Sequence, residues 1–376
     1  MSKEISFCPY RVCPLGAHID HQFGVVSGFA INKGIEIEYE KTDDGKVFLE
    51  SCDFEKKVEF KVNKTLVKEN DWADYLRGAT ASLQRNHALS YGIKAYIKGS
   101  LPIGGLSSSA AVIIAFLNAL CRVNNIKLTR HEMVMTALWA ENEFVGVSCG
   151  KLDQSCEIYS KKNNLLYIDM KDDSYELIPA SKNMPQFKIA IFFSGLERSL
   201  VGSQFNMRVD ELKSAAYMLK ALSGMEYGKF SDTRLRDVPR EIFENYKDAL
   251  PENWRKRATH YYSEMERVIK GKEAWKNGNI AEFGKLSFES GDSSIKNYET
   301  GSPQLIKIHE IMKETQGIYG GRFSGAGFKG CAMALVNPEF EEKIKYEVTQ
   351  KYLKEFPQLE GKFGIHFTHT ADGIDL

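Results

Sequence analysis

The sequence lacks both a net charge and a long apolar run. Fifty lysine and arginine residues balance fifty aspartate and glutamate residues, so the formal charge at pH 7 is +0. This balance removes the broad attraction expected of a protein that binds nucleic acid or an anionic membrane. No apolar run reaches the about 18 residues of a membrane span, and the first ten residues lack the features of a secretory signal. We therefore expect a cytoplasmic protein with neither nucleic acid nor a membrane as partner.

Cysteine is scarce and scattered. Seven cysteines occur, an odd number, and no two of them form a CxxC pair. This pattern favours reduced thiols over a disulfide framework or a structural zinc site, as is usual in the cytosol. The seven are Cys8, Cys13, Cys52, Cys121, Cys149, Cys156 and Cys331.

Apolar material, in contrast, suffices for two cores. The chain has 376 residues, of which 43% are hydrophobic and 27% charged. This length exceeds one ordinary core and predicts two domains of roughly 150 to 200 residues. We place them at residues 1–183 and 184–376, with the boundary in the stretch from Ser181 to Pro185. Two domains form a cleft, and we expect the protein to be a monomer.

The pattern of apolar residues predicts mixed α and β structure. Apolar and polar residues alternate at 34–40 and 93–97, which is typical of strands, so we expect the first hundred residues to form a sheet. Apolar residues recur every three or four positions at 110–123 and 130–143, which predicts helices. Further strands are predicted at 165–168 and 187–193, helices over most of 206–277, and a glycine turn with an apolar strand at 321–336.

A segment rich in glycine and serine, Leu101–Ala111, lies between a predicted strand and a predicted helix. Backbone N–H groups converge at such a helix start, and the helix dipole adds positive potential, so the segment suits a phosphate group. Paired glycines let a phosphate approach the main chain, and serine hydroxyls suit Mg²⁺. The sequence contains neither a Walker lysine nor GxGxxG. The alternative is a plain helix cap, which needs one serine only.

Two further segments are unusual. Tyr10–His21 packs one guanidinium, two imidazoles and a carboxylate into a short turn, a density of polar groups that suits sugar hydroxyls. A metal site built from the three side chains His18, Asp20 and His21 is the alternative. Gly320–Cys331 holds too many glycines for a core strand and allows two backbones, or a backbone and a ligand, to approach closely. Its alternative is a loop without function.

In this order the three segments resemble the signatures of the GHMP small-molecule kinases, most closely the galactokinase branch, over nearly the whole chain. The run PYRVCPLGAHIDHQ with Ile31–Gly34 is most similar to the galacturonokinases of that branch. The resemblance implies an α+β fold in two domains: an N-terminal domain like domain 2 of ribosomal protein S5, and a ferredoxin-like C-terminal domain. It also implies that ATP and a sugar meet in the cleft between them.

The resemblance also assigns the reacting groups. Asp153 in the stretch Cys149–Gln154 matches the aspartate that faces the anomeric hydroxyl, and a carboxylate there can accept its proton. Arg11 matches the arginine beside that aspartate, where a cation supports either a base mechanism or a mainly electrostatic one.

The same comparison implies ATP and Mg²⁺ as ligands. Ser109 and Glu141 match the metal-binding serine and glutamate, with Glu143 as a nearby competitor. The ATP phosphates are expected at the glycine and serine loop, on Pro102, Gly104, Gly105, Leu106, Ser107, Ser108, Ser109 and Ala110.

The sugar is expected on His18 and Asp20, with two departures from galactokinases. Ala17 stands where they carry a glutamate that reads the C6 hydroxyl, and Phe205 where they carry a sugar-binding tyrosine. Without that glutamate, a carboxylate at C6 meets no repulsion, so we expect phosphorylation of D-galacturonate at the anomeric hydroxyl. The candidate cations for its carboxylate are Lys33, Arg198 and Arg208.

Other readings stay open at this point. A galactokinase with a weaker C6 contact and a kinase for a 6-deoxy sugar are both consistent with Ala17, because one hydroxyl contact contributes only about 0.5–1.5 kcal/mol. A non-catalytic sugar sensor is disfavoured by the presence of Asp153, Arg11 and Glu141. A mevalonate or homoserine kinase is disfavoured by the polar turn around His18.

Overall fold

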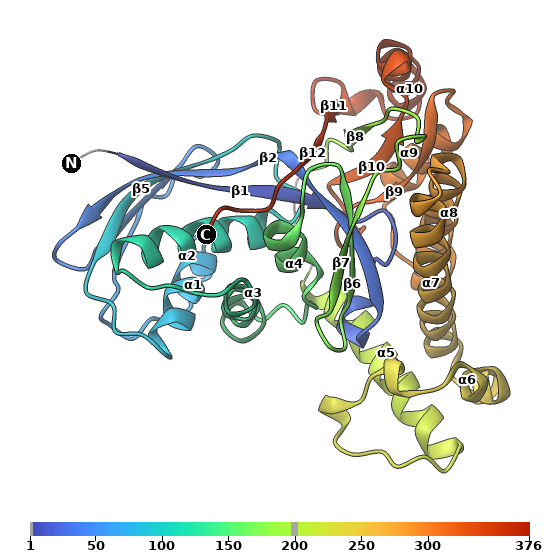
Figure 1. Cartoon of the computed structure of the whole chain (residues 1–376), viewed down its shortest axis with the longest axis horizontal. Coiled ribbons are helices and arrows are strands. Elements are labelled where there is room, and N and C mark those ends of the chain that lie inside the picture. The colour runs from blue at the N-terminus through green and yellow to red at the C-terminus, as the bar shows by residue number, and fades with distance from the viewer. Residues whose placement is uncertain (1–2, 197–201) are drawn as a thin grey trace.

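The computed structural model describes residues 3–196 and 202–376 and contains two β-sheets with their helices (Figure 1). The first sheet has eight strands in the order β4-β3-β5-β2-β6-β7, with β1 and β12 also paired to β2. These strands are β1 (Glu4–Val12), β2 (Val25–Thr42), β3 (Lys46–Ser51), β4 (Val58–Lys61), β5 (Gly92–Gly99), β6 (Asn164–Asp169), β7 (Tyr175–Pro179) and β12 (Thr370–Ala371). The strands predicted at 34–40 and 93–97 are confirmed as paired parts of β2 and β5, with Ile37 opposite Ile97.

Helices cover one face of this sheet, as the left half of Figure 1 shows. They are α1 (Asp74–Gln84), α2 (Ser108–Val123), α3 (Arg130–Trp139) and α4 (Leu152–Tyr159). Helix α2 is nearly all apolar and lies in the core against β1 and β2. The helix predicted at 130–143 begins as α3 and ends in a π-helical turn, η2 (Ala140–Val145).

Helix α1 was missed, because we expected only a sheet in the first hundred residues. Its centre contains Gly78, a residue that weakens isolated helices. A Cβ at Gly78 would lie 3.1 Å from the Phe144 ring and from the Ala140 carbonyl oxygen. Tertiary packing against η2 therefore stabilises a helix that local propensity does not indicate.

The second sheet consists of β8 (Lys188–Phe193), β9 (Ile318–Phe323), β10 (Cys331–Val336) and β11 (Gly364–Thr368), in the order β11-β8-β10-β9. All neighbours are antiparallel, and helices connect β8 to β9 and β10 to β11. This is the ferredoxin-like arrangement that we predicted. The connecting helices are α5 (Gly202–Leu222), α6 (Arg240–Tyr246), α7 (Glu252–Lys276), α8 (Ile280–Ser293), α9 (Pro303–Glu314) and α10 (Glu341–Glu355).

The last residues of the chain return to the first sheet. Strand β12 pairs with β2, and beyond it the backbone N–H groups of Gly373 and Ile374 donate to the carbonyl oxygens of Ser160 and Glu157, each at 2.8 Å. These acceptors belong to the end of α4, whose last carbonyl groups have no partner within the helix. The C-terminal tail therefore caps the helix whose first turn carries Asp153.

Gly373→Ala is expected to lower the free energy of unfolding by about 1–3 kcal/mol, because the added Cβ would lie 2.5 Å from the carbonyl oxygen of Ile158. Denaturant unfolding measures the effect. The control is Gly228→Ala, since nothing lies within 4 Å of a Cβ at Gly228. Equal stability of the two variants would show that the tail does not dock on α4.

Candidate active site

The structure brings Asp153 and Arg11 together. Asp153 lies in the first turn of α4, and Arg11 lies near the end of β1. Arg11 Nε donates to Asp153 Oδ1 at 2.7 Å, and Arg11 Nη1 donates to the carbonyl oxygen of Gly105 at 3.0 Å. The Arg11 side chain is 4% exposed and that of Asp153 25%. The arginine is thus a fixed support, and the carboxylate remains open to a reactant.

The second carboxylate oxygen of Asp153 is held by the glycine and serine loop. Ser107 Oγ donates to Asp153 Oδ2 at 2.7 Å. Ser107 precedes α2 and has a left-handed backbone, with φ at 63°. Sequence reasoning assigned Ser107 to the phosphates alone, and nothing in the spacing of 107 and 153 indicated this bond. The loop therefore orients the carboxylate as well as forming a helix start.

The other predicted phosphate-binding residues surround this helix start. Ser108, Ser109 and Ala110 form the first turn of α2, and the loop before them contains Gly104 and Gly105 with φ at 141° and 80°. The side chains of Leu106 and Ala110 are buried in the core, so only their backbone atoms are available to a ligand. Pro102 is exposed.

The two glycine-rich segments pack on each other, although more than two hundred residues separate them. A Cβ at Gly104 would lie 3.0 Å from the Cα of Gly330, and a Cβ at Gly105 would lie 2.7 Å from Cys331 Sγ. The close approach of two backbones expected for Gly320–Cys331 is thereby confirmed, since only residues without side chains leave room for it. The contact joins the two halves of the chain beside Arg11 and Asp153.

Glu141 lies in the π-helical turn η2 and is buried. Gln154, the residue after Asp153, donates to Glu141 Oε2 at 2.5 Å, and Cys149 lies 3.8 Å from the same oxygen. This bond places Glu141 beside the segment that carries Asp153. The carboxylate of Glu141 and the hydroxyl of Ser109 are hard oxygen donors of the kind Mg²⁺ prefers, so the types of their donor atoms fit the predicted metal.

The turn that contains the predicted sugar-binding residues lies against the same segment. A Cβ at Gly150 would lie 2.4 Å from Asp20 Oδ2, and the N–H of Leu152 donates to this oxygen at 3.3 Å. Burial and the charge of Asp153 raise the pKa of Asp20 to about 6. Asp20 and Asp153 therefore lie close enough for their charges to interact. Within the described residues, no group of three His, Cys, Asp or Glu side chains could hold a metal, so the alternative of a metal on His18, Asp20 and His21 is wrong.

Aromatic side chains from the second half of the chain cover this turn. The ring of His18 stacks on Tyr298 with centroids 4.3 Å apart, and the Tyr298 hydroxyl lies 3.4 Å from His21 Nε2. Phe205 contacts His21 edge-on, with centroids 6.0 Å apart. Sequence reasoning missed Tyr298, which belongs to no motif. Phe205 lies beside the turn as an apolar neighbour of His21, and its predicted contact with the sugar stays a prediction.

The candidate cations differ in position. Arg208 Nε donates to the carbonyl oxygen of Tyr298 at 3.1 Å, and Arg208 pairs with Glu211. Arg208 therefore lies next to the backbone of Tyr298. Lys33 contributes to the lowered pKa of His366 and thus lies near β11. Arg198 falls outside the described residues.

Acidification is expected to destabilise the protein between pH 6.5 and 4. Burial lowers the pKa of His260 from 6.5 to about 4 and that of His21 to about 3, and holds the pKa of His18 well below its usual range. Below pH 6.5 these histidines therefore become protonated in the unfolded chain but stay neutral in the folded chain. This difference lowers the free energy of unfolding by on the order of 3 kcal/mol for His260 alone. Asp20, with its raised pKa, contributes the opposite sign.

Unfolding by urea at pH 7.5 and pH 5.0 measures this dependence. His260→Gln should reduce it, and the control His131→Gln, at an exposed histidine, should not. Equal stability of the parent protein at the two pH values would contradict the assignment of neutral buried histidines.

Two family models and several known proteins match this chain. The family model for the N-terminal domain of GHMP kinases matches residues 74–161, and that for the C-terminal domain matches residues 272–354. A galacturonokinase of Arabidopsis thaliana is 41% identical over 376 residues, covering 94% of this chain and 88% of the relative. The chain belongs to the GHMP kinase family. The resemblance noted from the three motifs is thereby confirmed, and so is the predicted fold.

Other proteins similar to this GHMP kinase are named galactokinase or mevalonate kinase. A galactokinase of Thermococcus kodakarensis is 34% identical over 352 residues, covering 93% of this chain and 94% of the relative. The crystal structure of Lactococcus lactis galactokinase complexed with galactose superposes with a TM-score of 0.90 at 27% identity, covering 100% of this chain and 95% of that one. Methanococcus jannaschii mevalonate kinase, at 21% identity and a TM-score of 0.68, shares the fold over 99% of both chains.

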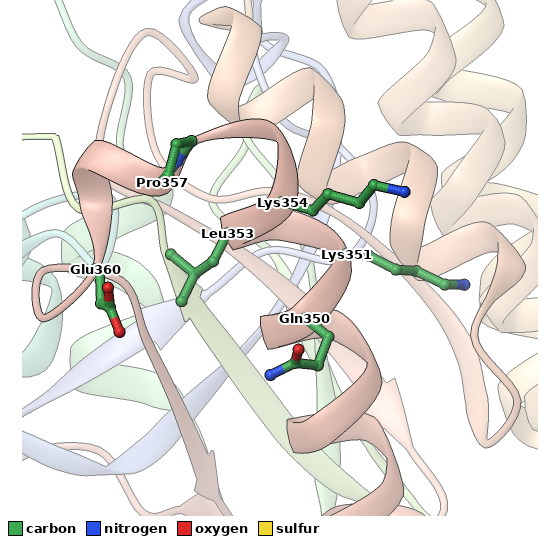
Figure 2. Close-up of a pocket in the computed structure, with 6 residues that line it drawn as sticks. All are labelled: Gln350, Lys351, Leu353, Lys354, Pro357 and Glu360. Atoms are coloured by element: carbon green, nitrogen blue, oxygen red, sulfur yellow. The ribbon is translucent and has the colours of Figure 1, made fainter.

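A surface hollow of about 500 Å³ lies elsewhere in the GHMP kinase, around helix α10 (Figure 2). Lys351 and Lys354 point away from Leu353 and Glu360 in this view. None of the predicted site residues lines the hollow, so it belongs to no part of the site described above. Its lining consists of Gln350, Lys351, Leu353, Lys354, Pro357 and Glu360.

Proposed function

We propose that the chain is an ATP-dependent sugar 1-kinase that converts D-galacturonate into galacturonate 1-phosphate. The observation that supports the reaction is Asp153, a partly exposed carboxylate held by Arg11 and Ser107 beside the glycine and serine loop. The observation that supports the sugar is Ala17 in the turn next to Asp20. Similarity to the Arabidopsis galacturonokinase supports the same sugar.

In the proposed reaction, the oxygen of the anomeric hydroxyl forms a bond to the γ-phosphorus of ATP. Asp153 accepts the proton that this hydroxyl loses. The bond from that phosphorus to the bridging β,γ-oxygen breaks, and ADP leaves with the electron pair. Arg11 holds the carboxylate through Nε and places positive charge beside the transferring group, where it offsets the charge of the transition state.

The phosphates of ATP would lie at the start of α2. The first backbone N–H groups of α2 have no acceptor within the helix and lie at the positive end of the helix dipole. Ser109 and Glu141 would hold Mg²⁺, which when bound offsets the negative charge of the phosphates. The absence of bulky side chains at Gly104 and Gly105 permits a close approach to the main chain.

The C6 group of the sugar would lie at Ala17. A glutamate about 4 Å from a substrate carboxylate would cost on the order of 4 kcal/mol at an effective dielectric constant near 20. Alanine removes this cost. Burial, followed by the charges of Arg322 and Arg11, holds the pKa of neighbouring His18 well below its usual range, so a neutral imidazole lies beside Ala17.

A galactokinase acting on D-galactose is the second candidate. The TM-score of 0.90 to a galactokinase with bound galactose supports it, since the folds agree over the whole chain. One lost hydroxyl contact reduces binding by only about 0.5–1.5 kcal/mol, so Ala17 alone does not preclude galactose.

The remaining properties are proposed on the same grounds. A division of the chain at residues 183 and 184 is supported by the two sheets, with β12 as a segment that returns to the first. A cytoplasmic location is supported by the seven free cysteines, all of them in the described residues, and the monomeric state stays a prediction. No helix in the described ranges is long and apolar enough to cross a membrane.

Incubation with Mg·ATP and a panel of sugars tests the proposal. The panel contains galacturonate, galactose, glucuronate, fucose and N-acetylgalactosamine, with ADP release followed continuously and the product identified by ³¹P NMR. We expect an anomeric phosphate of galacturonate. Binding of ATP and sugar in calorimetry without ADP release from any sugar would overturn the kinase assignment in favour of a sensor.

A further inference from the structure

Helix α7, from the second half of the chain, lies directly against the turn that carries the predicted sugar-binding residues. Three successive residues of the turn meet three positions on one face of α7. Leu15 packs where Gly271 has no side chain, since a Cβ there would lie 2.2 Å from Leu15 Cδ1. The N–H of Gly16 donates to Glu264 Oε1 at 2.7 Å, and His260 Nε2 lies 3.1 Å from the carbonyl oxygen of Ala17.

The hydrogen-bond network of His260 determines its role as a donor. The carbonyl oxygen of Ala17 can only accept, so Nε2 carries the proton, and Nδ1 accepts from Ser293 Oγ at 3.0 Å. Burial lowers the pKa of His260 to about 4, so this neutral form persists at physiological pH. His260 is wholly buried and therefore contacts the turn and not a ligand.

Glu264 is equally buried and is surrounded by donors. Its carboxylate accepts from Gly16 N–H, from Ser290 Oγ and from Arg267 Nε at 2.7 Å, and Arg322 Nη1 lies 3.5 Å away. Burial opposes ionisation, but Arg267 and Arg322 outweigh it and lower the pKa of Glu264 to about 2. Arg322 belongs to the glycine-rich segment Gly320–Cys331. The anchoring of the turn is thus connected to the segment that packs on the phosphate loop.

We propose that His260 and Glu264 are positioning residues that set the affinity of the site for its sugar. They fix the backbone on both sides of the Gly16–Ala17 peptide, where Gly16 has φ at 99° and tolerates no side chain, and thereby set the direction of Ala17 and His18. They contact neither Asp153 nor its two partners, Arg11 and Ser107. Loss of this support should therefore raise KM for the sugar and leave kcat and KM for ATP nearly unchanged.

This inference rests on the proposed sugar kinase activity, and it is tested with two substitutions at one position. His260→Leu removes the donor to Ala17, whereas His260→Gln retains an N–H donor. We expect KM for the sugar to rise about tenfold in His260→Leu and less than about threefold in His260→Gln. In both variants kcat and KM for ATP should stay within about twofold of the parent protein. The matched control is Thr259→Ala, whose hydroxyl bonds only within α7.

Glu264→Gln is the second probe, with thermal unfolding recorded for every variant. The preference of the unmodified protein among sugars tests the proposed function. The change in KM for the sugar that it turns over best, whichever sugar that is, tests the inference. An unchanged KM for this sugar in His260→Leu would overturn the inference. The inference would also be overturned if the leucine and glutamine variants showed the same rise in KM for the sugar and the same fall in kcat, because this result would indicate a general folding role.

Discussion

Asp153→Asn is expected to lower kcat by about 10²- to 10⁴-fold, with KM for the sugar and for ATP within a few-fold of the parent values. The amide keeps the shape of the carboxylate but cannot accept the anomeric proton. Arg11 and Ser107 both donate to the carboxylate at 2.7 Å, so the variant also exchanges one accepting oxygen for an NH₂ group. Steady-state kinetics with saturating Mg·ATP measures the loss.

The control for this substitution is Asp43→Asn, at an exposed aspartate paired with Lys41 on the surface. It should leave kcat unchanged. Retention of more than a tenth of kcat by Asp153→Asn would show that neither proton transfer to Asp153 nor its negative charge is needed for the reaction.

Ala17→Glu is expected to lower kcat/KM for galacturonate about 10³-fold more than kcat/KM for galactose. A repulsion on the order of 4 kcal/mol between the new carboxylate and that of the substrate corresponds to this factor. Galactose carries no charge at C6, and its C6 hydroxyl can donate a hydrogen bond to the glutamate. The ratio of kcat/KM for the two sugars, measured in competition, gives the shift.

Ala17→Gln separates charge from size in this experiment. Ala17 is 7% exposed, so any longer side chain at this position requires some adjustment of the turn. The glutamine variant should lose activity equally for both sugars, and the glutamate variant should lose it selectively for galacturonate. Equal losses in the glutamate variant would show that C6 is not read at Ala17.

The features that the sequence predicted correctly are those with a local physical cause. Alternation in β2 and helical spacing in α2 reflect which side chains face the core, and both predicted ranges lie within the observed elements. The glycines of the two loops could be interpreted because their left-handed backbone and close packing require the absence of a side chain.

Features created by contacts distant in the sequence were not predictable in this way. Helix α1 depends on packing of Gly78 against η2, and the C-terminal tail depends on unpaired carbonyl groups at the end of α4. Neither leaves a periodic signal.

The same limit applies to the site. Asp153 and Arg11 could be proposed from motifs, but their approach to 2.7 Å spans 142 positions of the chain. His260 and Glu264 stand four residues apart on a highly charged helix, a spacing equally typical of a solvated face. Only the fold shows that both are buried against the turn at Ala17.

The comparison of galacturonate with galactose tests the central claim most directly. Purified protein with saturating Mg·ATP is assayed over a range of each sugar, and the products are identified by NMR. We predict a kcat/KM for galacturonate at least about a hundredfold above that for galactose, about 2.7 kcal/mol of discrimination in the transition state. A higher kcat/KM for galactose would contradict the account and show a galactokinase with an altered C6 pocket.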